Sequence, residues 1–481
     1  MLQESSSAHI PDCRTWACRC AGPEGNLEGA GWCSLRRPWL LRSCVALTRP
    51  GNGQAGRTRR QRPMTARPVD DHDIVVVCNA QQEVLVALFD QHAEVCLVLD
   101  GMDRRYRPLD QRLLDQCEKV YRISSFDSIA ELSAVAVDLR SSGRTVAEVF
   151  CQAETSQFGA GYLKLLLGRS GNPLHHVAHR DKRLMKELVR GAGVPTAEFR
   201  SLPDPADAAA VTRIAAELSA PLIVKPASGY GATTTEKVDD AADLATVATG
   251  LTFDVSQRSH QLIVEEYVTG EELCVDAIWS GDKALTFVVH RYLRPRITVL
   301  DNRLDGSMIL LPEDYPELYE RLRDMHTRLN PALGIDSGPT HVEVFERPDG
   351  ELLFSEIASR PGGGWIQLMI GAYHGHATWP LAASAALTGT IPALHSARPY
   401  VGGISVRPTV PGVITEMPTD EELSRHPGMI TWHRRRQIGD RARCDGPSDW
   451  YLFLIFGADS EDELVDLCVE AAQTLTIRTD G

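Results

Sequence analysis

An unbroken run of β-branched residues, Ile74 to Val77, is the feature that most limits what this chain can fold into. Such a run is typical of a parallel strand that is buried on both faces, and its sheet needs helices on either side. Residues 81–91 follow with helical spacing, and 94–99 form a second apolar run. The same alternation predicts strands at 120–123 and 129–132 and a helix around 146–157. The first part of the chain is therefore predicted to be a small doubly wound α/β domain.

Beyond residue 222 the pattern changes to shorter apolar segments that are typical of antiparallel strands. The turn Arg347-Pro-Asp-Gly350 joins the last two of these segments into a predicted hairpin. We expect strands at 222–225, 262–266, 274–279, 284–290, 340–345 and 352–357, and helices at 180–191, 366–387 and 460–475. The pattern predicts a mixed α/β (α+β) fold, which combines a parallel sheet with a larger antiparallel sheet.

Charge and composition exclude several classes of protein. The net charge is −14, yet residues 1–63 carry ten arginines and four acids, which leaves −20 for the rest. Such an acidic body argues against nucleic acid as a partner, because phosphate contacts need clustered Lys and Arg. No run approaches the roughly 18 apolar residues of a membrane span. Seven widely spaced cysteines after residue 63, without a CxxC pair, indicate buried thiols in a reduced, cytoplasmic setting.

The first 63 residues differ from the rest and allow three interpretations. They could be an Arg-rich transit segment, although four acids and the lack of an amphipathic period argue against this. The cluster Cys13, Cys18, Cys20 and Cys33 could bind a metal, but its spacing fits no standard pattern. In the third interpretation Met64 is the true start, because regular hydrophobic patterning begins only at Asp73. We expect 1–63 to be a disordered leader or a mis-assigned start.

Lysine is rare in this chain, with seven lysines against 43 arginines. A retained lysine therefore indicates a position where a compact ammonium group is required. Lys182 opens a predicted amphipathic helix, and Lys225 ends a predicted strand. Small and hydroxyl residues follow at 227–235, where backbone N–H groups could close on phosphate oxygens. A simple turn explains the loop equally well when it is taken alone.

Two carboxylates, Glu343 and Glu356, lie on the two strands of the predicted hairpin. Within its own strand, each glutamate shares a face with the residues two positions before and after it. Two inward carboxylates beside a phosphate loop favour Mg²⁺, which prefers oxygen ligands. Arg360 and a glycine-rich turn, 362–364, follow directly. No GxxxxGK[ST] sequence is present, which excludes a Walker-A nucleotide site.

In this order and spacing, the motifs resemble the ATP-grasp superfamily, and within it the carboxylate–amine ligases such as the L-amino-acid ligases. The resemblance covers about 180–364 closely. It implies an ATP-grasp fold with an N-terminal doubly wound α/β domain, a small lid, a large antiparallel-sheet domain and a C-terminal α+β subdomain. The corresponding domains are a leader at 1–63, the α/β domain at 64–174, the ATP-grasp domain at 175–398 with its lid at about 200–268, and the C-terminal subdomain at 399–481.

The resemblance also implies roles for individual residues. ATP phosphates would contact Lys182, Lys225 and the lid loop with Ser228, Gly229, Gly231, Ala232 and Thr233. Adenine would be held at Glu265, Glu266 and Val268, and the ribose at Glu272. Glu343 and Glu356 would bind Mg²⁺, or Mn²⁺ in its place. Arg360 and Lys225 would act in catalysis, and substrates would contact Arg294, Arg296, Gly362, Gly363 and Gly364. One departure is Ala358, where many family members have Asn.

The implied activity is an ATP-dependent ligase that forms an amide or peptide bond through an acyl phosphate and releases ADP and phosphate. Its partners would be small carboxylate and amine substrates rather than nucleic acid or membrane, and it could act as a homodimer. Two alternatives stay open at this point. The chain could resemble biotin carboxylase, although it has no Met-Lys-Met biotinyl sequence. It could also be a nucleotide-binding regulator without turnover, which Ala358 favours.

We predict that residues 1–63 are dispensable. A chain that begins at Met64 should keep the thermal stability and activity of the full chain, because no core pattern precedes Asp73. Melting temperature and ATP turnover measured on both chains check this. An insoluble or inactive shortened chain would contradict it.

Overall fold

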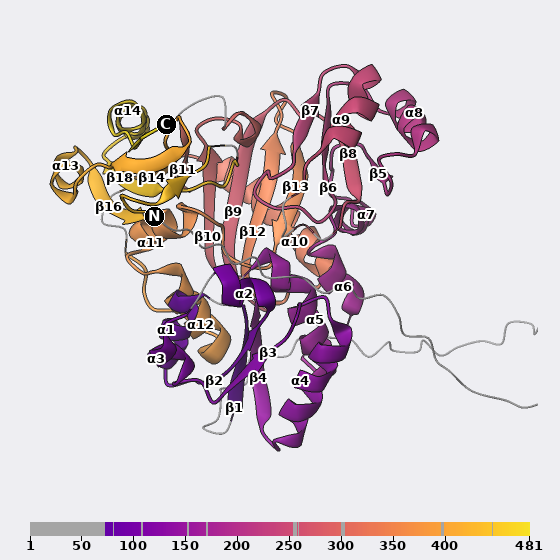
Figure 1. The fold of residues 1–481 in the computed structure, drawn as a ribbon, viewed down its shortest axis with the longest axis vertical. Coiled ribbons are helices and arrows are strands. Elements are labelled where there is room, and N and C mark those ends of the chain that lie inside the picture. Colours follow the sequence, from indigo (N-terminus) through magenta and orange to yellow (C-terminus); the bar gives the residue numbers. More distant parts are fainter. Residues whose placement is uncertain are drawn as a thin grey trace, which may run out of the picture. The chain divides into compact units, whose positions relative to one another are not determined.

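The computed structural model describes residues 73–481 except 80, 107–108, 152, 170–171, 254–256, 258, 300–303, 396–398 and 445. The expectations for residues 1–63 lie outside these described residues. The described residues belong to one unit, Arg62–Gly481 (Figure 1). Among the helices described, none is both long and apolar enough to cross a membrane.

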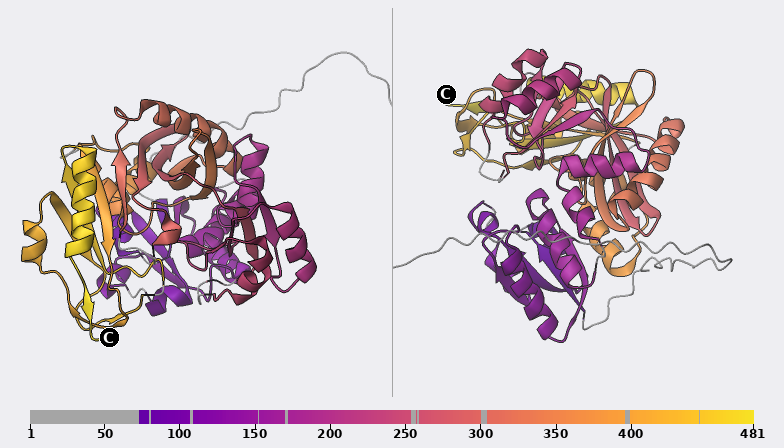
Figure 2. Two further views of the ribbon diagram at one scale, coloured as in Figure 1. Left: turned by 90° about the horizontal axis from the view of Figure 1, so that it is seen from above. Right: turned by 90° about the vertical axis from the view of Figure 1, so that its right-hand side faces the viewer.

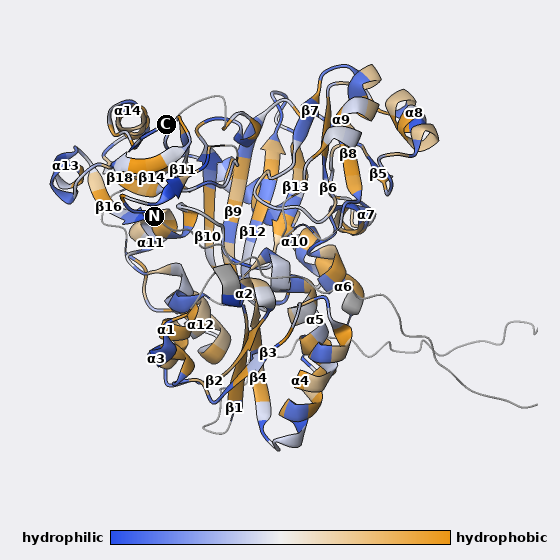
Figure 3. Ribbon diagram, in the orientation of Figure 1, coloured by the Kyte–Doolittle hydropathy of each residue, from blue (hydrophilic) through white to orange (hydrophobic). Residues whose placement is uncertain are grey.

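The first sheet is parallel, with strand order β3-β2-β1-β4. Its strands are β1 (Asp73–Cys78), β2 (Glu94–Leu99), β3 (Lys119–Arg122) and β4 (Thr145–Cys151). Helices cover both faces, as the apolar run predicts, and Figure 3 shows the apolar strands. Val75 and Val77 pack with α1 (Gln82–Phe89), whereas Ile74 and Val76 pack with α4 (Ile129–Ser141) and α5 (Gln157–Leu166). Two short helices, α2 (Gly101–Tyr106) and α3 (Gln111–Leu114), complete this part.

Two predicted elements of this region are wrong. The strand expected at 129–132 is the start of helix α4, because its buried residues Leu132, Val135, Ala136 and Leu139 have helical spacing that a four-residue window cannot show. The helix expected around 146–157 is largely strand β4, whose residues pair in parallel with β1. Helical structure begins there only at Glu154.

A smaller antiparallel sheet with order β5-β8-β6-β7 follows. It is formed by β5 (Phe199–Leu202), β6 (Leu222–Pro226), β7 (Glu236–Val238) and β8 (Leu262–Glu266). One face packs on helices α8 (Ala208–Glu217) and α9 (Leu244–Gly250) through an apolar cluster that includes Leu222 and Val264. The expected strands at 222–225 and 262–266 are confirmed.

The largest sheet has eight antiparallel strands in the order β13-β12-β9-β10-β11-β14-β18-β16. The strands are β9 (Glu271–Ser280), β10 (Lys283–Tyr292), β11 (Asp305–Leu310), β12 (Ser337–Glu346), β13 (Leu352–Ala358), β14 (Tyr400–Val406), β16 (Met429–Arg434) and β18 (Leu452–Ala458). Because side chains alternate along a strand, Leu273, Val275 and Ala277 of β9 join an apolar cluster with α10 (Pro316–Leu333). Glu272 and Asp276 belong to the opposite face.

Strands after residue 399 extend this same sheet, and helix α14 (Glu461–Thr474) packs on β14 and β18 (Figure 2). The domain boundaries predicted at 174/175 and 398/399 stay a proposal. The expected helix at 366–387 is divided into α11 (Ile366–His374) and α12 (Thr378–Thr388), because Gly375 ends α11 in a left-handed conformation. The remaining elements are α6 (Pro173–Ala178), α7 (Lys182–Gly191), α13 (Asp420–Arg425), β15 (Gly412–Glu416), β17 (Arg441–Ala442) and β19 (Arg478–Thr479).

Candidate active site

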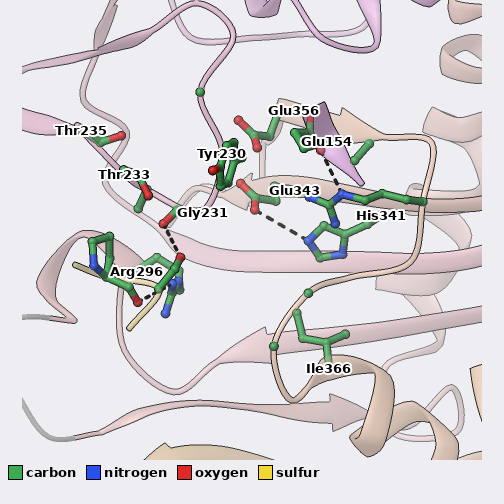
Figure 4. Close-up of a pocket in the computed structure, with 18 of the residues that line it drawn as sticks. Glu154, Tyr230, Gly231, Thr233, Thr235, Arg296, His341, Glu343, Glu356 and Ile366 are labelled. Atoms are coloured by element: carbon green, nitrogen blue, oxygen red, sulfur yellow. Dashed lines mark hydrogen bonds and ion pairs between the residues drawn. The ribbon is translucent and has the colours of Figure 1, made fainter. Parts of the chain in front are cut away.

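A cavity of about 1800 Å³ is lined by the eight-stranded sheet, the β5-β8-β6-β7 sheet, the loop 229–235, helix α1 and the segment 446–450. Ligand pockets usually measure about 300–1,000 Å³, so this cavity has room for more than one ligand. Figure 4 shows residues that line it. Most of the predicted site residues line this cavity.

Glu343 and Glu356 are directly opposite each other on β12 and β13, and both line the cavity (Figure 4). The Glu356 carboxylate lies 2.9 Å from the Lys182 ammonium group. Burial alone would raise the pKa of Glu356, but Lys182 and Lys225 hold it at about 2. Two oxygen ligands at neighbouring positions, one of them firmly ionised, form a donor set that suits a divalent cation. The predicted pairing of the two carboxylates is therefore present in the fold.

Lys182 is fixed in place by the start of helix α7. Asp181 caps the helix by accepting hydrogen bonds from the backbone N–H groups of Arg183 and Leu184. The Lys182 N–H donates to the Ala227 carbonyl, and its ammonium group donates to the Gly229 carbonyl at 2.9 Å. The helix start thus places this lysine between Glu356 and the loop that was predicted to hold phosphates.

A second group of buried charges is formed by Glu265, which lies between two lysines. Its carboxylate is 3.2 Å from the Lys225 ammonium group and 3.4 Å from that of Lys186. Burial would raise the pKa of Glu265, but the two lysines hold it below its ordinary value. Burial lowers the pKa of Lys186 to about 8. Removing one partner from such a buried network costs about 3–5 kcal/mol, because a charge is left unpaired.

The carboxylate of Glu265 is therefore already occupied by lysines, so the predicted adenine contact would have to share it. The other residues expected near adenine and ribose, Glu266, Val268 and Glu272, all line the cavity. Glu272 accepts a hydrogen bond from the Arg296 N–H at 2.9 Å. Burial, together with the nearby Glu343 carboxylate, raises the pKa of Glu272 to about 7.

The loop 229–235 has an unusual backbone. Gly231, Ala232 and Thr234 all have φ between 57° and 59°, in the left-handed region that non-glycine residues seldom adopt. The Ser448 hydroxyl donates to the Gly231 carbonyl at 3.1 Å, which links this loop to the segment 446–450. Of the residues predicted to hold phosphates, Gly229, Gly231, Ala232 and Thr233 line the cavity, whereas Ser228 does not.

The predicted substrate residues are brought together only in part. Arg360, Gly363 and Gly364 line the cavity. Arg296 also lines it and forms an ion pair with Asp305. Arg294 is exposed and, like Gly362, is not among the lining residues of the described chain.

Several lining residues were missed by the sequence analysis. Lys186 lies one helical turn after Lys182, so its position in the rare lysine set could have identified it. Glu154 binds the Arg360 guanidinium at 2.9 Å across 206 positions of sequence, for which the sequence holds no signal. His341 also lines the cavity and belongs to a buried group with Asp276 and His290.

Comparisons with known proteins agree with this geometry. Residues 218–368 match the family model of the ATP-grasp domain. The chain is 26% identical to the L-arginine-specific L-amino acid ligase of Bacillus subtilis, over 77% of this chain and 88% of that ligase. It is 31% identical to D-alanine–D-alanine ligase A of Chromobacterium violaceum, over 38% of this chain. That second match spans about half the length of the D-alanine ligase.

Among solved structures, the L-amino acid ligase from Bacillus licheniformis has a TM-score of 0.65 and 16% identity, over 86% of this chain and all of that chain. This likeness shows the fold. The predicted resemblance to the ATP-grasp carboxylate–amine ligases is confirmed, and so is the ATP-grasp fold. The curated relatives are carbon–nitrogen ligases, and the prediction that this chain is an enzyme of that class is confirmed.

We predict that Glu272→Gln stabilises the ligand-free protein more at pH 8 than at pH 5. The folded-state pKa of Glu272, about 7, lies above its ordinary value of 4.5, so its contribution to stability is complete below pH 4.5 and is lost as pH rises through 7. The glutamine variant should avoid this loss, which is about 3 kcal/mol for a shift of this size.

Thermal melting at both pH values checks the prediction, with Glu271→Gln as the matched control. Glu271 is adjacent, exposed and paired with Arg291 on the outside. Equal effects of Glu272→Gln at the two pH values would contradict the expectation.

Proposed function

We propose that the protein joins a carboxylate, activated as an acyl phosphate, to an amine, with release of ADP and phosphate. The observation that carries this proposal is the pairing of Glu343 with Glu356 on adjacent strands, with Lys182 beside Glu356. Lys182 also contacts the loop 229–235, whose backbone N–H groups could bind phosphate oxygens. This arrangement brings cation ligands and positive charge to one place. In-line phosphoryl transfer depends mainly on such positioning and charge neutralisation.

The donor set fits a divalent cation, and Glu343 with Glu356 would hold Mg²⁺ or Mn²⁺. A cation bound there would neutralise phosphate charge. Ala358, which lines the cavity where many family members have Asn, offers no side-chain ligand. The two glutamates would therefore carry the coordination from protein side chains.

The chain's own residues account for the other requirements of the reaction. Lys182 and Lys225 would hold phosphate oxygens, and Arg360 would stabilise charge on the transferring phosphoryl group. The loop 229–235, joined to Ser448, would exclude water and protect the acyl phosphate from hydrolysis. The free volume beyond the nucleotide would receive the acid and the amine.

Amino acids are the proposed substrate class. The curated relative that covers most of this chain is named as an L-amino acid ligase, and the cavity is large enough for two small substrates beside a nucleotide. A screen of paired amino acids that measures ADP formation would identify the acid and the amine. Bicarbonate as the sole acid serves as the control for a carboxylase-like activity.

We predict that Lys225→Ala and Glu356→Gln each lower kcat by about 10²–10³-fold, because each removes charge that acts on the transferring phosphoryl group. ADP formation at saturating ATP and magnesium measures this effect. Lys237→Ala and Glu351→Gln are matched controls, because both residues are solvent-exposed and outside the cavity lining. Near-native kcat in either test variant would refute the assignment.

We further predict that the acid is phosphorylated before the amine enters. Enzyme, ATP, Mg²⁺ and the correct acid should yield a hydroxamate when hydroxylamine is added. Carboxylate labelled with ¹⁸O should deliver one label to the released phosphate. Adenylation would instead place the label in AMP and release pyrophosphate, and AMP as the main nucleotide product would overturn the proposal.

A further inference from the structure

Asp276 lies at the centre of the large sheet, beneath the cavity, and is 6% exposed. One carboxylate oxygen, Oδ2, accepts hydrogen bonds from two histidines of the neighbouring strands. These are His290 Nε2 on β10 and His341 Nδ1 on β12, each at 2.9 Å. The carboxylate therefore joins three adjacent strands on their cavity-facing side.

The second carboxylate oxygen, Oδ1, holds the glycine-rich loop. It accepts the Gly362 N–H at 2.8 Å. A Cβ atom at Gly362 would lie 3.0 Å from Asp276 Oδ1, 3.0 Å from His341 Nδ1 and 2.7 Å from Ile366 Cγ2. The loop thus approaches Asp276, His341 and Ile366 so closely that a side chain at Gly362 would force the loop or these neighbours to shift.

The same network reaches the proposed catalytic groups on both sides. Arg360, two residues before Gly362, and Gly363, directly after it, line the cavity. On the other side, His341 Nε2 lies 3.7 Å from the Glu343 carboxylate (Figure 4). Asp276 therefore contacts the loop 360–364 through Gly362, and it contacts strand β12, which bears Glu343, through His341.

We infer that Asp276 is a positioning residue that holds the loop 360–364 in register with Glu343. This inference rests on the proposed function, since it concerns the loop that carries Arg360. Without the Asp276 acceptor, the loop loses its buried anchor, and Arg360 and the cation ligand no longer keep a fixed separation. Residues that orient catalytic groups in this way typically contribute about 10–100-fold to activity.

A different use of the histidines has to be distinguished. Cys274, His290 and His341 are buried with potential ligand atoms within 4.8 Å of one another, a spacing that could hold a transition metal. Each ring contacts Asp276 through one nitrogen only, and a metal-bound histidine commonly donates its other N–H to a carboxylate, so these hydrogen bonds are compatible with both uses. Metal analysis of the purified protein separates the two.

The experiment compares two variants that disturb the same contact in different ways. Asp276→Asn weakens the acceptor, and Gly362→Ala displaces the loop while the acceptor is kept. The control is His326→Gln, since His326 is equally buried but stacks on Trp279 on the opposite face of the sheet. Three quantities are measured below the melting temperature of each protein: amide formed per ADP released, KM for ATP, and hydrogen exchange of the peptide that contains Gly362.

Both test variants should form amide about 10–100-fold more slowly, release ADP with less amide per turnover, and keep KM for ATP within about 2-fold. The Gly362 peptide should exchange faster in both. The control should lower the melting temperature and leave the coupling ratio unchanged. If Asp276→Asn does not fold, Gly362→Ala decides the outcome alone.

Native coupling in the folded test variants, or unchanged exchange of the Gly362 peptide, would overturn the inference. A transition metal bound in stoichiometric amount would overturn it as well. If the unaltered enzyme forms no amide from any acid and amine, the proposed function fails, and the exchange measurement then decides on the loop anchor by itself.

Discussion

The structure of the cavity depends on an alternation of buried charges. Three lysines, Lys182, Lys186 and Lys225, surround the carboxylates of Glu265 and Glu356, and all five groups are largely removed from solvent. Isolated charges at this depth would be strongly destabilising, so each group is tolerated because of its neighbours. One positive charge is left over in this set of five. A phosphate chain bound as proposed would meet this positive charge at the lysines, while Glu272 and Glu343 add negative charge elsewhere in the cavity lining.

The alternation of side chains along β-strands explains how one sheet serves two purposes. Odd-numbered residues of β9, such as Leu273 and Val275, pack with α10 and contribute to the core. Even-numbered residues, such as Glu272 and Asp276, lie on the opposite face, where Glu272 lines the cavity together with Glu343 of β12. A shift of one residue in either strand would bury carboxylates in the core and expose aliphatic side chains. The hydrophobic face thus fixes the position of the chemically active face.

The sequence predicted those features that depend on residue type and short spacing. Lys182 and Lys225 were identified because lysine is rare, and Glu343 and Glu356 because a hairpin fixes their relative position. Features that depend on distant segments could not be found in this way. Glu154 meets Arg360, and Asp276 meets Gly362, only because the chain folds back over 206 and 86 positions. The misassigned segment 129–132 has a simpler reason, since four residues are too few to distinguish a helical from a strand period.

A crystal structure with MgADP and a phosphorylated analogue of the activated acid would test the central claim most directly. A cation should lie between the carboxylates of Glu343 and Glu356, with phosphate oxygens at Lys182 and Lys225. The Lys182–Glu356 contact should lengthen as both groups turn to their ligands. A nucleotide bound with its phosphates away from these lysines, or a cation held by neither glutamate, would refute the proposed site.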